Sequence, residues 1–323
     1  MRWLVSFSLL AGCGSPPRSA DAGAIDAPPR PFVAGVTFLD EAPTAIAFTP
    51  DDQLIVSTRT TLRRLTNNGD EVWRIPLTSG MIQYAGRETS VEVSVSGRIA
   101  FHQGPEMAVY EPDSTVIWSK YLMGLYDMNF GPGDEVVVVY DLGWVVGFSG
   151  TRGEAIFSGY GPLTKASGPI AVNSTGSIAY IQVTDTTVSR WDAAGNPLAA
   201  WHASTPLTGI VFDASDRLVG LRSGDPVTYE RFDVAGAPTG MVSGGVGAGY
   251  PAFVLRPGGF FEWRQAFPGD TTGAISINVL DQNAGLVSTI ARTNATGLVA
   301  ACGSAGHCAA GAEAKWIETF AVP

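Results

Sequence analysis

Lysine is scarce in this sequence, and charged residues are few. Of the 323 residues, 15% are Asp, Glu, Lys or Arg, and the net charge is −10. The lysines are Lys120, Lys165 and Lys315. No stripe of basic residues with interleaved aromatics occurs, so we expect no nucleic-acid partner, because phosphates repel an acidic surface. Gly (39) and Pro (21) are abundant instead, which is typical of a turn-rich β protein.

Long hydrophobic runs and helical periodicity are also lacking. The apolar run at residues 3–10 is far shorter than the ~20 residues that a membrane-spanning helix needs. No long segment places apolar residues at i, i+3, i+4 and i+7, the pattern of an amphipathic helix. The sequence therefore predicts an all-β fold with almost no helix.

Patterns that mark a metal, cofactor or catalytic site are missing. The histidines, His102, His202 and His307, lie far apart and show neither His-x-x-x-His nor Cys-x-x-Cys spacing. No Asp-x-Asp-x-Asp-Gly calcium loop and no Gly-x-Ser-x-Gly elbow occurs. We therefore assign no catalytic, cofactor-binding or metal-binding residue, and we expect no cofactor.

The amino end has the features of a lipoprotein leader. Arg2 supplies a positive charge, residues 3–10 are apolar, and Leu10-Ala11-Gly12-Cys13 follows at once. This order resembles the lipobox of bacterial lipoproteins, which implies cleavage before Cys13 and acylation of its thiol. Fatty chains at ~0.8 kcal/mol per buried methylene would make a stable anchor. In that family a residue other than Asp after the cysteine, here Gly14, implies the outer membrane, with the side that the protein faces left open.

Three segments are expected along the chain. Residues 1–12 are the predicted signal peptide. Residues 13–31 are rich in Pro and Ala and have no hydrophobic period, which indicates an extended tether. Residues 32–323 are the predicted folded body, and the membrane is expected to be a partner through the lipid on Cys13.

A four-strand unit at residues 43–77 recurs along the folded body. Each unit has a turn between its first two strands, and these turns are spaced by 36 to 47 residues, with a mean of about 42. That period is typical of the four-stranded blades of a β-propeller. The predicted turns lie at Asp52, Gly97, Gly133, Gly176, Asp216, Gly259 and Gly306.

The seventh unit is short by one strand, and residues 32–39 form a spare strand before the first unit. We expect this strand to pair as the outermost strand of the last blade, because an open ring would expose unpaired edges. The sequence thus predicts seven blades closed by the amino-terminal strand. Six blades followed by a carboxyl-terminal hairpin is the alternative.

Several units carry an aromatic residue four positions after a turn residue: Trp73 after Gly69, Trp118 after Ser114, and Phe157 after Gly153. The pattern resembles the tryptophan-marked repeats of the quinoprotein-like propeller superfamily. That group includes quinone-dependent dehydrogenases and an envelope lipoprotein of the outer-membrane assembly machinery. The dehydrogenases often carry adjacent cysteines, which this chain lacks. Physically, the aromatic is expected to pack against the next blade while the glycine permits the turn.

Acidic residues and a cysteine pair each have two interpretations. Acidic residues sit at equivalent turns and would be catalytic only if they converged, so the turn role is favoured. Cys302 and Cys308 are either a redox pair or a disulfide that staples the last hairpin, and the disulfide is favoured. The acidic residues are Asp51, Asp52, Asp134, Glu135, Asp213 and Asp216.

Two functions are consistent with this sequence. The first is a non-catalytic envelope lipoprotein, expected to be a monomer, whose propeller binds or scaffolds a protein or glycan partner. The alternative is an envelope enzyme, a polysaccharide hydrolase or lyase, with a site at the mouth of the channel. A group of arginines has two interpretations: a face that binds an anionic ligand, or solvated residues on strands. They are Arg59, Arg63, Arg64, Arg87 and Arg98.

Overall fold

The computed structural model divides into two units after Pro31, and all described residues belong to the second unit, Phe32–Pro323. The predicted leader, Cys13 and the tether therefore lie outside the described residues. In the part that the structure describes, no helix is long and apolar enough to cross a membrane. The described residues are 35–77, 89–160, 167–182, 185–213, 215–222, 228–233, 235–243, 250–256, 259–265, 275–281, 283, 285–292, 299–303, 306–312 and 315–321.

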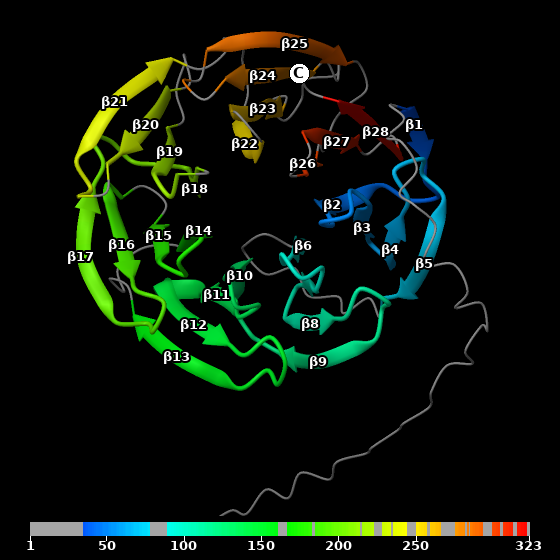
Figure 1. Ribbon diagram of the computed structural model, residues 1–323, viewed down its shortest axis with the longest axis horizontal. Helices are drawn as coiled ribbons and strands as arrows, with labels where there is room; N and C mark the ends of the chain where they lie inside the picture. Colours follow the sequence, from blue (N-terminus) through cyan, green and yellow to red (C-terminus); the bar gives the residue numbers. More distant parts are fainter. Residues whose placement is uncertain are drawn as a thin grey trace, which may run out of the picture. The chain divides into compact units, whose positions relative to one another are not determined.

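Seven four-stranded antiparallel sheets build the second unit, which confirms the predicted seven-bladed propeller; the six-blade alternative is wrong. The first strand of each blade lies at the centre and the last at the rim (Figure 1). Blades 1 to 3 consist of β2 (Pro43–Phe48), β3 (Leu54–Thr58), β4 (Thr61–Leu65), β5 (Glu71–Pro76); β6 (Thr89–Val93), β7 (Ile99–Gln103), β8 (Glu106–Tyr110), β9 (Val116–Tyr121); and β10 (Leu125–Phe130), β11 (Val136–Tyr140), the 3-10 helix η1 (Asp141–Gly143), β12 (Trp144–Phe148), β13 (Ala155–Tyr160).

Blades 4 to 6 repeat this arrangement, and blade 7 takes only three strands from the carboxyl end. Blades 4 to 6 consist of β14 (Ser167–Val172), β15 (Ile178–Gln182), β16 (Thr187–Trp191), β17 (Pro197–His202); β18 (Gly209–Phe212), β19 (Leu218–Arg222), β20 (Thr228–Phe232), β21 (Pro238–Ser243); and β22 (Tyr250–Arg256), β23 (Gly259–Gln265), β24 (Ile275–Asp281), β25 (Leu286–Arg292). Blade 7 consists of β26 (Val299–Cys302), β27 (His307–Ala312), β28 (Trp316–Ala321) and β1 (Gly35–Phe38).

Strand β1 closes the ring, as the sequence predicts. It pairs antiparallel with β28, in a register that runs from Gly35 opposite Thr319 to Phe38 opposite Trp316. The amide of Leu39 continues the pairing by donating to the carbonyl of Lys315 at 2.8 Å. The spare strand therefore spans fewer described residues than predicted, since residues 32–34 lie outside them. Its pairing covers the edge of β28 that would otherwise be open.

Because consecutive strands are antiparallel, the connections alternate between two ends of the blades. We call the end with the first-to-second and third-to-fourth turns the turn face. The opposite end, with the second-to-third turns and the connections between blades, is the loop face. Connections on the turn face are short and uniform, whereas β5 and β6 are separated on the loop face by residues 77–88. Variation in the length of the connections is thus concentrated on the loop face.

The turns between first and second strands are close to their predicted positions, with two corrections. In blade 3 the residue with positive φ is Asp134 (φ 63°), not the predicted Gly133. Pro132 favours the second position of a type I turn, which places the left-handed residue two positions later. In blade 6 the predicted turn residue Gly259 is already the first residue of β23, paired with Arg256.

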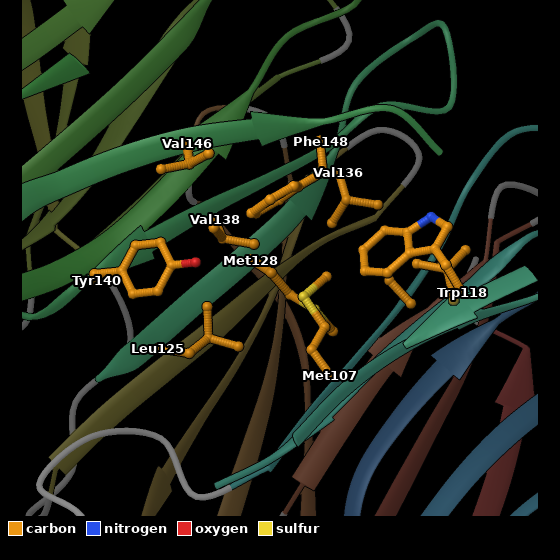
Figure 2. Close-up of a cluster of buried hydrophobic side chains, with 11 residues drawn as sticks. Met107, Trp118, Leu125, Met128, Val136, Val138, Tyr140, Val146 and Phe148 are labelled. Atoms are coloured by element: carbon orange, nitrogen blue, oxygen red, sulfur yellow. The ribbon is translucent and has the colours of Figure 1, made fainter. Parts of the chain in front are cut away.

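Apolar residues between the blades form the core. The continuous apolar run of β11 is explained by its position inside a sheet that is covered on both sides. Val136 and Val138 pack against blade 2, while Val137 and Val139 belong to the cluster shared with blade 4. Figure 2 shows the first of these clusters, in which Met107 and Trp118 of blade 2 meet the side chains of blade 3. Each such side chain contributes about 1.5–3 kcal/mol by burial.

Aromatic residues of the fourth strands pack against the next blade at several blade junctions. The indole of Trp118 lies under Gly153 of blade 3, where an added Cβ would be 2.8 Å from its ring, and its Nε1 donates to the carbonyl of Gly150 at 3.2 Å. Phe157 lies under Gly195 of blade 4 in the same way. The predicted packing of the aromatic against the next blade is therefore correct. The glycine that receives it belongs to the next blade rather than to its own.

Candidate functional site

The three histidines occupy different blades and do not meet. His102 is fully buried in β7, His202 is exposed on β17, and His307 pairs with Asp52. Among the described residues no group of three or more His, Cys, Asp or Glu side chains could hold a metal ion.

Acidic turn residues tie neighbouring blades together on the turn face. Three aspartates with positive φ each accept a hydrogen bond from the turn of the preceding blade. This contact offsets the conformational cost of a non-glycine residue in that region. The bonds run from Ser96 Oγ to Asp134 at 2.7 Å, from Ser174 Oγ to Asp216 at 2.5 Å, and from His307 Nδ1 to Asp52. The acidic residues therefore have the predicted turn role and also join the blades.

Three carboxylates are buried inside the blades, and each accepts a bond from another blade or from a connection between blades. Removing such a partner would take a hydrogen bond from a buried polar group, which is costly. The bonds join Asp127 to the amide of Ile170 (3.3 Å), Glu230 to the amide of Ser204 (3.0 and 3.1 Å), and Glu262 to the hydroxyl of Tyr229 (2.6 Å). These carboxylates serve to position blades, and within the described residues they do not gather at one point.

The arginines singled out from the sequence mostly hold the fold together. Arg63 is buried and pairs with Asp40. Arg64 pairs with Asp51 at 2.8 Å and also donates to the carbonyl of Pro112. Arg98 pairs with Asp134 at 3.1 Å, and Arg59 is exposed. Arg87 lies outside the described residues. An anionic-ligand face made by these arginines gains no support.

An aromatic ladder, which we define as Tyr140, Trp144 and Tyr160, lies on the loop face of blade 3. Tyr140 and Trp144 stack with ring centroids 4.8 Å apart at 26°, and Trp144 and Tyr160 with centroids 6.0 Å apart at 11°. Trp144 and Tyr160 are directly opposite each other in the β12–β13 pair. Their exposed fractions are 37% and 66%, whereas Tyr140 is buried. The ladder thus leads from the interior to the surface along three adjacent strands.

The position of Trp144 is occupied by different residue types in different blades. Trp144 is the first residue of the third strand in its blade. The same register position, opposite the last residue of the fourth strand, is occupied by Thr61 in blade 1, Glu106 in blade 2, Thr187 in blade 4 and Thr228 in blade 5. The position is occupied by Ile275 in blade 6 and by Trp316, opposite Phe38, in blade 7. Three of the seven blades therefore carry threonine here, so packing of the fold does not require tryptophan at this place.

Polar and apolar groups surround the ladder. The amide of Asp141 in η1 donates to the carbonyl of Gly124 at 2.7 Å, so η1 is fixed to the connection from blade 2. Burial raises the pKa of the Asp141 carboxyl and raises the pKa of Tyr140 to about 12. Met123, next to Gly124, is 55% exposed. The loop face between blades 2 and 3 therefore presents aromatic, thioether and carboxyl groups together.

A groove of about 480 Å³ lies beside blade 2. Its walls include Leu77 at the end of blade 1, Phe101 and Met107 inside blade 2, and Lys120 and Tyr121 on β9. The chain that follows Leu77 lies outside the described residues, so we assign no function to this groove.

The structure joins the sulfurs of Cys302 and Cys308 at 2.06 Å. The two residues are directly opposite each other in the β26–β27 pair. Next to them, His307 contacts Asp52 of blade 1. The bridge in the mature protein stays a prediction. Cys13, the predicted lipidation site, lies outside the described residues.

Sequence reasoning missed the aromatic ladder. Trp144 stands at a blade position whose identity depends on the exact register of three strands, which the turn spacing does not supply. A comparison of the first residues of the third strands would have shown two tryptophans, Trp144 and Trp316, where three other blades have threonine. That signal was available once the strand starts were known.

Comparison with known proteins identifies the fold. No protein-family model matches the chain, and no curated protein matches it. A solved structure of virginiamycin B lyase from Staphylococcus aureus, in selenomethionine-substituted form, is similar, with a TM-score of 0.65 and 11% sequence identity; the match covers 90% of this chain and 100% of that one. Because 1390 solved chains match in all, a likeness at this identity carries no information about activity. The comparisons and the strand order together assign the chain the fold of a seven-bladed β-propeller.

Proposed function

We propose that this chain is a lipid-anchored envelope protein whose propeller binds a partner through its loop face and catalyses no reaction. The anchor is the acylated thiol of Cys13, and the address is the outer membrane. Support for the anchor comes from the Leu10-Ala11-Gly12-Cys13 order after a short apolar run. The proline-rich segment after it would give the propeller reach from the lipid surface.

A binding role is favoured over catalysis by how the buried acids are used. The carboxylates of Asp127, Glu230 and Glu262 each hold a backbone amide or a phenol of a neighbouring segment. A general acid or base must instead reach a substrate proton. Aspartates on the turn face are similarly engaged with the preceding blade.

One observation carries the choice of the loop face. Trp144 and Tyr160 are exposed there, and the register position of Trp144 is threonine in three other blades and tryptophan, Trp316, in blade 7. Exposed aromatic residues that the fold does not require are typical of binding surfaces. The loop face also carries the connections between blades, where variation is tolerated.

The anchor is tested with full-length chain in a bacterial host fed a palmitate analogue. The wild-type protein is expected to incorporate the label and to fractionate with the outer membrane, and Cys13→Ser is expected to lose both properties. An unmodified Cys13 thiol in the mature wild-type protein would contradict the proposed anchor.

The binding role is tested by capture. Full-length protein in detergent micelles is immobilised and exposed to envelope extract and to purified envelope glycans. We expect the wild-type protein to retain a specific component, and a variant with Tyr160 replaced to fail to retain it. Failure to retain any component would remove the support for a binding module.

An enzyme is the second candidate, because propellers can carry catalytic sites built from residues that are distant in sequence. A polysaccharide lyase or hydrolase would have its site at the mouth of the channel, built from residues of several blades. The assay incubates full-length protein with envelope polysaccharides and follows new reducing ends and unsaturated products. Turnover of an envelope polysaccharide by the full-length wild-type protein would favour the enzyme over the binding module.

A further inference from the structure

We propose that the aromatic ladder of Tyr140, Trp144 and Tyr160 is a glycan-binding platform for neutral or N-acetylated sugars. The inference rests on the proposed binding function and names the ligand class and the residues that would contact it. A pyranose ring has an apolar face of C–H groups, and these groups are attracted to the electron-rich face of an aromatic ring.

The geometry of the ladder leaves aromatic faces available. Trp144 and Tyr160 are nearly parallel, at 11°, with centroids 6.0 Å apart. Tyr140 also stacks on Trp144, with centroids 4.8 Å apart, and β12 lies between β11 and β13 in the sheet, so Trp144 has an aromatic neighbour on both adjoining strands. Trp144 is still 37% exposed, and Tyr160, on the outermost strand, is 66% exposed. The ring of Tyr160 and the exposed part of Trp144 thus form the aromatic surface on which a sugar ring would stack.

Rigidity favours this use of the ladder. All three rings project from paired strands: Tyr140 ends β11, Trp144 begins β12 and Tyr160 ends β13. Trp144 is directly opposite Tyr160, and β11 pairs with β12 on the other side. The connection from blade 2 is fixed to η1 through the Asp141 amide. A preformed platform loses little conformational freedom when a ligand binds.

Charge narrows the class of sugar. The chain has a net charge of −10, and the Asp141 carboxyl lies in η1, between Tyr140 and Trp144 in sequence. Acidic polysaccharides would be repelled by this surface. A carboxyl group accepts hydrogen bonds from sugar hydroxyls or from an N-acetyl amide. Uncharged and N-acetylated sugars therefore fit the site better than uronic acids do.

The repeat supplies the test variant. Trp144→Thr introduces the residue that the same position carries in blades 1, 4 and 5, so the fold should be retained. Ile156→Thr is the matched control, because Ile156 is also exposed on β13 (54%) and lies outside the ladder. Circular dichroism and thermal unfolding verify that both variants are folded.

The experiment measures binding of chitohexaose and of purified peptidoglycan sacculi to full-length protein in micelles. We expect saturable binding by the wild-type protein, at least about tenfold weaker binding by Trp144→Thr, and unchanged binding by Ile156→Thr. Quenching of tryptophan fluorescence by chitohexaose should also disappear in Trp144→Thr.

Three outcomes would overturn the inference. They are no binding of either probe by the wild-type protein, equal binding by wild type and Trp144→Thr, and loss of a captured protein instead of a glycan in Trp144→Thr. The second and third outcomes leave the proposed binding function standing with a different surface or partner. Absence of any captured envelope component, in the capture assay with envelope extract, would instead remove the binding function itself.

Discussion

Single residues at the turns decide how closely the blades approach one another. Where an aromatic side chain of one blade lies under a turn of the next, the turn residue has no room for a side chain. Gly195 is such a residue: its φ is 81°, and an added Cβ would be 2.5 Å from Phe157 Cβ and Cγ. Glycine is therefore required at this position for two reasons: the backbone has a positive φ, and the ring of Phe157 comes too close for a side chain.

Replacing Gly195 with alanine is expected to destabilise the fold. The control is Gly97→Ala, since Gly97 has nearly the same φ (86°) but its added Cβ would be 3.3 Å from the nearest atom, in Pro112. Backbone strain is thus matched, and the overlap with Phe157 should cost a further ~1–3 kcal/mol. Urea unfolding measures the difference. Equal losses in the two variants would show that the phenylalanine gives way.

A second residue-scale prediction concerns pH. Hydrogen bonds from the hydroxyls of Thr60 and Thr58, with a further one from the Thr60 amide, lower the pKa of Glu41 from its ordinary value of 4.5. A lowered pKa in the folded state contributes stability above 4.5, and this contribution is lost as pH falls through the folded-state value. Glu41→Gln should therefore reduce the loss of stability between neutral pH and a pH well below 4.5.

The comparison for Glu41 is the difference in free energy of unfolding between the two pH values, in wild type and variant. Asp113→Asn is a positive control. Bonds from Thr115 also lower the pKa of Asp113, so this variant should likewise reduce the loss of stability at low pH. A Glu41→Gln variant with the same pH dependence as wild type would contradict the assigned bonds.

At the scale of the element, the hairpin β26–β27 contacts blade 1 through its turn. His307 at its turn pairs with Asp52, and an added Cβ on Gly303 would be 2.8 Å from the carboxylate of Asp52. Cys302 and Cys308 flank this turn. A covalent link here would hold the innermost hairpin of the last blade in the shape that meets the first.

Cys302 and Cys308 are expected to be oxidised in the mature protein. A double Cys302→Ser, Cys308→Ser variant should lose about 2 kcal/mol, the chain-entropy value for a short loop. Electrophoretic mobility with and without reductant, after blocking of free thiols, measures the oxidation state. Two freely alkylated thiols in wild-type protein from the envelope would contradict the disulfide and revive the redox interpretation.

Element positions were predictable where the signal is local, and unpredictable where it depends on contacts between blades. Turn residues such as Asp52 and Gly176 identify hairpins from sequence because few residues adopt positive φ. Asp134 was misplaced by one residue since aspartate and glycine both suit that conformation. The partner of Trp118 could not be assigned, because Gly153 belongs to the next blade. The ladder around Trp144 was missed because it needs the register of three strands.

At the scale of the whole molecule, ring closure depends on one pairing, β1 with β28. Deleting residues 35–38 should expose the edge of β28 and lower stability, with association or aggregation through the open edge. Deleting residues 28–31, which precede the folded unit, is a control of equal length. Sedimentation velocity should find monomers for wild type and control and larger species for the β1 deletion. A monomeric and equally stable β1 deletion would show that closure is dispensable.

The joining of the first strand to the last also sets the order of events in biosynthesis. Gly35 is opposite Thr319, so the ribosome must complete almost the whole polypeptide before the final sheet can be assembled. Contacts so distant in sequence form slowly. A nascent chain with this arrangement stays incompletely folded until its last residues arrive.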